Sequence, residues 1–158
     1  MEAGSGGISL YIHIPFCQAK CTYCDFNSFA GLDELFDDYA AALVREMELV
    51  EPAPIKTIYV GGGTPTVLPL EHLGTVLEGV RDVFVLNRDV EISIEANPGT
   101  LVPDKLRRLS ALGVNRLSLG VQSFDRGELA QLGRIHSAAE AVTAFYSARQ
   151  AGFDNINL

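Results

Sequence analysis

The chain alternates short segments of period-two apolar and polar residues with longer segments that have helical spacing. The period-two alternation predicts strands near residues 9–14, 56–60, 90–95, 116–121 and 155–158. Apolar residues at helical spacing predict helices near residues 33–51, 69–84, 103–112 and 137–151. Strands and helices that alternate in this way are typical of an α/β fold with a parallel sheet.

Local signals support the predicted helix boundaries. Ser137 and Glu140 have the spacing of a capping box, which predicts the start of the last helix. Pro103 suits the first turn of a helix, and Gly113 and Gly152 suit helix ends. The helix boundaries therefore rest on both periodicity and capping residues.

One face of each predicted strand is unusually polar. In the first strand Tyr11 and His13 alternate with Ile12 and Ile14, and later strands repeat this pattern. The later polar positions include Thr57, Tyr59, Glu91, Ser93, Glu95, Arg116, Ser118, Asn155 and Asn157. Closed barrels normally fill their lumen with branched apolar side chains, so a polar lumen indicates an open barrel that holds a ligand. The alternative is an amphipathic sheet with one face in solvent.

Three cysteines, Cys17, Cys21 and Cys24, lie directly after the first predicted strand, and the chain has no other. Cysteines this close would gain little loop-closure entropy from a disulfide, so a metal or a cluster is the better explanation. Three thiolates can bind three irons of a four-iron cluster and leave the fourth iron without a protein ligand. The alternative is a structural zinc ion, with His13 as the fourth ligand.

The loops after the other strands also carry groups that can bind a ligand, as parallel barrels require. After the second strand, Gly61, Gly62 and Gly63 allow the backbone to approach a ligand, and Thr64 follows them. No lysine comes next, so this is not a P-loop. The later loops carry Glu95, Ala96, Asn97 and Pro98, then Gln122, Ser123, Phe124, Arg134 and His136.

Composition narrows the class of protein. The 158 residues are 47% hydrophobic, enough for one folded unit with a core, and the formal net charge of -8 argues against a nucleic-acid surface. The first residues lack the basic and apolar regions of a leader, and no apolar run is long enough for a membrane span. We therefore expect a cytoplasmic protein.

The cysteine arrangement C-x-x-x-C-x-aromatic-C, with Tyr23 as the aromatic residue, resembles that of the radical S-adenosylmethionine (SAM) superfamily. Five further motifs follow the same order: YIHIPFC, GGGTP, IEANPGT, RLSLGVQSFD and LGRIHS. They resemble the branch that contains oxygen-independent coproporphyrinogen III dehydrogenases (oxidases) and HemW heme chaperones. The resemblance extends from about Leu10 to the last residue and implies a partial (β/α) barrel of the radical SAM type.

The resemblance also implies cofactors and their binding residues. Cys17, Cys21 and Cys24 would hold a 4Fe-4S cluster whose open iron binds SAM. The implied SAM contacts are Tyr11, Gly62, Gly63, Thr64, Glu95, Gln122 and Arg134. Each contact has a structural alternative: an ion pair with Arg116 for Glu95, barrel packing for Tyr11 and a solvated charge for Arg134. We assign no role to His136.

Two departures separate the relatives within this branch. The dehydrogenases have a fourth cysteine where this chain has Phe26, and they carry a longer N-terminal extension than the few residues before the first strand here. Both features favour a chaperone that binds heme and transfers it to an acceptor protein, with an electron donor such as a flavodoxin or ferredoxin. The alternatives are oxidative decarboxylation of coproporphyrinogen III and a structural zinc module.

The sequence stops within the predicted fifth strand. We therefore expect residues 1–158 to be an incomplete radical SAM core, without the rest of the barrel and without a C-terminal domain that would face heme. An open barrel with an unpaired edge strand is expected to be marginal or prone to association. This exact chain is then expected to bind a cluster poorly and to complete no turnover.

Overall fold

A five-stranded parallel sheet forms the centre of the computed structural model, which describes residues 7–158. The strand order is β1-β4-β5-β6-β7. The strands are β1 (Ile8–Ile14), β4 (Pro54–Gly62), β5 (Val85–Ala96), β6 (Arg116–Leu119) and β7 (Asn155–Asn157). The α/β class and the parallel sheet are thus confirmed. The N-terminal residues 1–6, where the sequence predicts no leader, lie outside the described residues.

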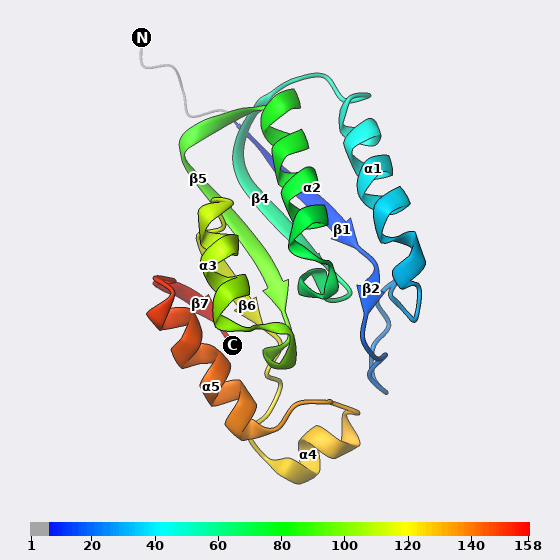
Figure 1. Cartoon of the computed structure of the whole chain (residues 1–158), viewed down its shortest axis with the longest axis vertical. Coiled ribbons are helices and arrows are strands. Elements are labelled where there is room, and N and C mark those ends of the chain that lie inside the picture. The colour runs from blue at the N-terminus through cyan, green and yellow to red at the C-terminus, as the bar shows by residue number, and fades with distance from the viewer. Residues whose placement is uncertain (1–6) are drawn as a thin grey trace.

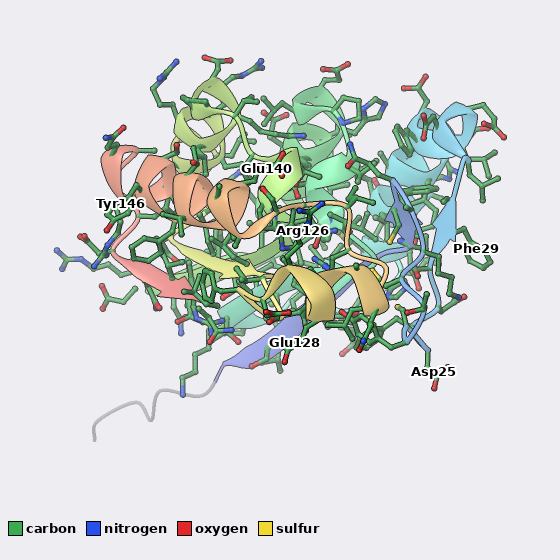
Figure 2. All side chains as sticks on the ribbon, turned by 90° about the horizontal axis from the view of Figure 1, so that it is seen from below. Asp25, Phe29, Arg126, Glu128, Glu140 and Tyr146 are labelled. Carbon is green, nitrogen blue, oxygen red and sulfur yellow. The ribbon has the colours of Figure 1, made fainter. Side chains whose placement is uncertain are left out.

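The main helices cover one face of this sheet. Figure 1 shows α1, α2, α3 and α5 in front of the strands, and Figure 2 shows the same helices on one side of the sheet. Within the described residues, the opposite face has no helix over it. The helices are α1 (Phe36–Met47), α2 (Leu70–Val83), α3 (Pro103–Ala111), α4 (Arg126–Gln131) and α5 (Ala138–Gln150). None of them combines the length and apolar character that a membrane crossing requires.

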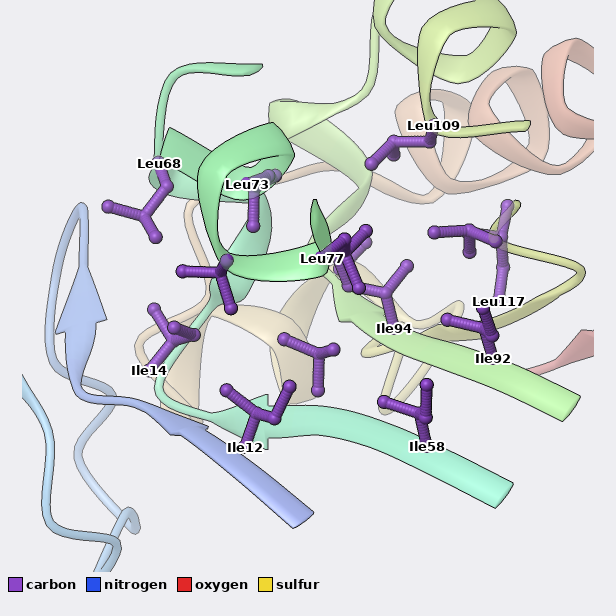
Figure 3. Packing of buried hydrophobic residues seen from close by; sticks show 14 of the residues in the cluster. Ile12, Ile14, Ile58, Leu68, Leu73, Leu77, Ile92, Ile94, Leu109 and Leu117 are labelled. Carbon is purple, nitrogen blue, oxygen red and sulfur yellow. The ribbon is translucent and has the colours of Figure 1, made fainter. Parts of the chain in front are cut away.

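The core lies between the sheet and these helices. Ile12, Ile58 and Leu117, from three different strands, point toward α2 and α3 and are at most 2% exposed. Leu77 and Leu109 from those helices pack against them (Figure 3). Because strand side chains alternate between faces, the apolar positions of each strand are the ones that the helices cover.

The polar positions consequently lie on the open face of the sheet. Register pairs Tyr11 with Tyr59, Tyr59 with Ser93, and Ser93 with Arg116, so these residues form one row across four strands. A parallel sheet with helices on one side only and polar residues on the other is the arrangement of an open barrel wall. The expected partial (β/α) barrel agrees with this arrangement.

Several boundaries differ from those that periodicity predicts. The helix expected over 33–51 is α1 preceded by the 3-10 turn η1 (Asp33–Leu35). It ends at Met47, where Leu49 and Val50 donate their backbone N-H groups to carbonyls three residues back instead of four. The strand expected over 116–121 ends at Leu119, because Val121 donates its backbone N-H to the Leu119 carbonyl and Gln122 has φ +68°. The capping box of α5 is confirmed.

Candidate functional site

A cavity of about 280 Å³ lies at the carboxyl ends of the central strands. It gathers the three cysteines and six of the seven residues that the sequence assigns to SAM. Of the seven, Tyr11 is the one that does not line it. The lining includes Cys17, Cys21, Cys24, Gly62, Gly63, Thr64, Glu95, Asn97, Gln122 and Arg134.

The cysteine loop is anchored at both ends and in the middle. Cys17 belongs to β2 (Phe16–Cys17), which pairs in parallel with β3 (Phe29–Ala30) across the loop. Between the strands, Thr22 donates its backbone N-H to Leu132 and its hydroxyl to the Gln131 carbonyl. The loop is therefore held by β3 and by α4, neither of which the periodicity predicts.

The glycine loop packs directly against the cysteine loop. The N-H of Gly63 donates to the Ile14 carbonyl at 2.8 Å, and the N-H of Thr64 donates to the Phe16 carbonyl at 2.7 Å. A Cβ on Gly63 would lie 2.6 Å from the Phe16 oxygen and 3.0 Å from the Cys17 sulfur. Glycine is required here by the close approach of two backbone segments.

Glu95 lines the cavity and accepts two hydrogen bonds. The Tyr59 hydroxyl donates to it at 2.7 Å and the Gly62 N-H at 3.0 Å. Burial and the neighbouring Glu95 raise the pKa of Tyr59 to about 12. Arg116 instead contacts Glu91 at 4.0 Å, so the alternative pairing of Glu95 with Arg116 is wrong. Glu95 has a defined orientation at the edge of the glycine loop.

Tyr11 and His13 form a separate pair on the open face of β1. The Tyr11 hydroxyl lies 3.0 Å from His13 Nδ1, and His13 Nε2 lies 2.9 Å from the Asn27 carbonyl oxygen. Both imidazole nitrogens are thus engaged, which leaves His13 without a free lone pair for zinc. Among residues 7–158, no three His, Cys, Asp or Glu side chains are grouped closely enough to hold one metal ion.

Arg134 connects the far side of the cavity to the cysteine loop. Its Nη1 donates to the Cys21 sulfur at 3.3 Å, and its Nη2 donates to Asn97 Oδ1 and to the Gly120 carbonyl. Its Nε is buried and has no hydrogen-bond partner among residues 7–158. A buried donor without a partner is costly unless a bound group meets it, so Arg134 is not the solvated charge of the alternative interpretation.

Gln122 enters the cavity from a constrained turn. Its φ of +68° is the one positive value among the non-glycine residues of the described chain. The buried His136 lies beside this turn, with Nε2 3.2 Å from the Val121 carbonyl oxygen. Burial, and then the charge of Arg134, lower the pKa of His136, which favours the neutral imidazole. The structure thus gives His136, unassigned from sequence, a contact that supports the turn.

The residues around the cavity fit a cluster with SAM beside it. Three thiols from one loop suit the soft ligand requirement of iron in iron-sulfur clusters, and no fourth cysteine competes for the last position. The glycine backbone, the Glu95 carboxylate and the Arg134 guanidinium offer acceptors and donors for the amino and carboxylate groups of a small molecule.

The comparison with protein families decides the assignment. The sequence matches the model of the Radical SAM superfamily over residues 11–158. The chain belongs to the radical SAM superfamily. This membership confirms the resemblance seen in the cysteine motif.

Relatives within the superfamily include heme chaperones. The chain is 45% identical to the heme chaperone HemW of Escherichia coli (strain K12), covering 96% of this chain and 41% of the relative. It is 43% identical to the heme chaperone HemW of Bacillus subtilis (strain 168), covering 95% and 41%. This radical SAM chain therefore spans about two fifths of the length of the curated relatives it matches.

A solved structure supports the same fold. Coproporphyrinogen III oxidase (HemN) from Escherichia coli, described as a radical SAM enzyme, superposes with a TM-score of 0.87 at 34% identity. The match covers 94% of this chain and 35% of the oxidase. The expected HemN-like fold of the radical SAM type is therefore confirmed.

Proposed function

We propose that this radical SAM chain binds a 4Fe-4S cluster and SAM as part of a heme chaperone. The observation that carries the proposal is the meeting of three cysteines with Glu95 and Arg134 around one cavity. The 45% identity to a heme chaperone supports the choice of biological role. Heme is then the cargo and a heme-acceptor protein the recipient, and we propose the cytoplasm as the place of transfer.

In this proposal the thiolates of Cys17, Cys21 and Cys24 hold three irons. The cluster held there would supply the one-electron chemistry that cleaves the sulfonium of SAM, with a flavodoxin or ferredoxin as the proposed electron donor. The protein's part is to position the molecule and to exclude water.

The other cavity residues would orient SAM. Gly62 and Gly63 offer backbone groups without side-chain interference, and Gln122 and Thr64 offer polar atoms. Glu95 would accept from amino or hydroxyl groups, and the guanidinium of Arg134, which also lines the cavity, would donate to a carboxylate. Tyr11 does not line the cavity, and its proposed contact with SAM would come from β1 at the edge of the sheet.

Phe26 favours the chaperone over the dehydrogenase. Its side chain lines the cavity and is 68% exposed, at the position where the dehydrogenases carry a further cysteine. A phenyl ring cannot bind iron or transfer a proton. Because the match covers 41% of the heme chaperone, we propose that the heme contacts lie in the remainder of the full-length protein.

An anaerobic assay with the full-length, cluster-loaded protein separates the two roles. Coproporphyrinogen III, SAM and a reductant are supplied, and porphyrin products are followed by chromatography. The chaperone role predicts no protoporphyrinogen, together with stable heme uptake seen as a Soret band that co-elutes with the protein. Release of protoporphyrinogen would instead establish the dehydrogenase, and binding of zinc without iron would establish a structural zinc module.

A further inference from the structure

A chain of side-chain hydrogen bonds joins two of the three cysteines. It runs from Cys21 through Arg134, Asn97 and Thr64 to Cys17. Arg134 Nη1 lies 3.3 Å from the Cys21 sulfur, Asn97 Nδ2 lies 3.0 Å from Thr64 Oγ1, and that oxygen lies 3.7 Å from the Cys17 sulfur. Asn97 is the central member and has no part in the cofactor assignment above.

The chemistry of Arg134 fixes the orientation of the Asn97 amide. A guanidinium only donates, so the oxygen atom of the Asn97 side chain must face Arg134. Its nitrogen then faces Thr64 and donates to the hydroxyl oxygen. A thiolate that holds iron has no proton to give, so with a cluster bound the Thr64 hydroxyl is the donor to the Cys17 sulfur. Both sulfurs therefore sit at the accepting end of a hydrogen bond.

The backbone and a glycine hold Asn97 in this orientation. The backbone carbonyl of Asn97 accepts from the backbone N-H of Thr100 at 2.9 Å and from the Thr100 hydroxyl at 2.7 Å. A Cβ on Gly120 would lie 3.0 Å from Asn97 Oδ1 and 3.2 Å from Arg134 Nη2. The space around the amide is thus closed on the side where it meets Arg134.

We propose that Asn97 is a positioning residue that keeps both cysteine sulfurs hydrogen-bonded and thereby raises the reduction potential of the cluster. This inference rests on the proposed function, because it requires a cluster on Cys17 and Cys21. Reduction adds negative charge to the cluster, and a donor aimed at a ligand sulfur stabilises the charge-rich reduced state.

The sharpest test is Asn97→Asp, which keeps the shape of the side chain and changes its hydrogen bonding. A carboxylate still accepts from Arg134, but its second oxygen also accepts. The Thr64 hydroxyl then donates to the carboxylate and is withdrawn from Cys17. The added charge alone also lowers the potential, so Thr64→Val provides a neutral variant that removes the same donor, and Thr64→Ser retains it.

The measurement is the midpoint potential of the reconstituted full-length protein, followed by electron paramagnetic resonance during a redox titration. We expect Asn97→Asp and Thr64→Val each to shift the midpoint to more negative values, and Thr64→Ser to leave it unchanged. We also expect the shift caused by Asn97→Asp to be smaller when Thr64 is already valine, because the withdrawn donor is then absent.

The outcomes are distinguishable. Iron content and urea denaturation would detect a merely structural role of Asn97. Such a role would lower cluster loading or protein stability, while the midpoint potential of the remaining clusters would stay at the wild-type value. That result, or additive shifts in the double variant, would overturn the inference and leave the proposed function intact. Failure of the wild-type protein to form any cluster would overturn both.

Discussion

Gly63 leaves no room for a side chain between the glycine loop and the cysteine loop. Its Cβ would lie 2.6 Å from a backbone oxygen of Phe16, which cannot move without displacing Cys17. We expect Gly63→Ala to lower the free energy of unfolding by about 1–3 kcal/mol and to reduce cluster loading. Urea denaturation and iron analysis measure the two effects.

Gly99→Ala is the matched control for this prediction. A Cβ on Gly99 would meet nothing within 4 Å, so the change in the free energy of unfolding should stay within about 0.5 kcal/mol. Equal losses of unfolding free energy in Gly63→Ala and Gly99→Ala would show that the contact between the glycine loop and the cysteine loop does not contribute to stability.

Tyr59 makes stability depend on alkaline pH. Burial and the bond to Glu95 raise its pKa from 10.0 to about 12. Between these values the unfolded chain binds fewer protons than the folded protein, so the free energy of unfolding falls as the pH rises through this window. The stabilisation is fully present below pH 10.

Tyr59→Phe removes this titration, so urea denaturation at pH 9 and pH 11 provides the test. We expect the stability difference between wild type and variant to shrink at the higher pH. Tyr11 and Tyr39, whose pKa values burial also raises, are present in both proteins and largely cancel. A difference that is the same at both pH values would contradict the account.

The sequence predicted which residues meet at the cavity wherever their position relative to a strand end was sufficient to place them. Glu95 ends a predicted strand, and the cysteines and Arg134 come after predicted strands; parallel strands bring those segments to one edge of the sheet. The bridging role of Asn97 was not predictable, because it depends on the mutual approach of loops far apart in sequence. The same holds for the contact of His136 with the Val121 carbonyl.

At the scale of elements, the capping box of α5 gives a direct test. The Ser137 hydroxyl oxygen accepts from the Glu140 N-H, and the Glu140 carboxylate accepts from the Ser137 N-H. Ser137→Ala should lower the free energy of unfolding by about 1 kcal/mol. Thermal and urea denaturation at neutral pH measure this loss.

Ser110→Ala on the exposed side of α3 is the control, since Ser110 lies inside a helix and caps nothing. Alanine is the better helix former, so we expect this change to be neutral or slightly stabilising. If Ser137→Ala were equally neutral, the capping box would not contribute to the stability of α5.

The regular elements were largely predictable because apolar positions mark the buried face of every strand and helix. The predicted boundaries were wrong where hydrogen bonding between strands extends a strand beyond its alternating apolar and polar residues. β5 begins at Val85, before the expected residue 90, because Val85 pairs with Pro54 and Leu86 with Ile55 ahead of an irregularity in register. The periodicity does not predict α4, because six residues are too few to show a helical repeat. This helix nevertheless anchors the cysteine loop.

At the scale of the whole molecule, the division between the two faces of the sheet explains both stability and site. The apolar face packs against α1, α2, α3 and α5, while no helix covers the polar face within residues 7–158 (Figure 2). Polarity on one face alone left open whether that face meets solvent or a ligand. The cavity at the strand ends and membership of the radical SAM superfamily favour the ligand.

Electron paramagnetic resonance of the anaerobically reconstituted, reduced full-length protein, with and without SAM, tests the central claim most directly. We predict a 4Fe-4S signal that SAM changes, that Cys21→Ser abolishes and that Asp25→Asn retains. Asp25 lies on the same loop and points away from the rest of the molecule (Figure 2), outside the cavity lining. Zinc bound in place of iron, or a cluster signal that SAM leaves unchanged, would contradict the claim.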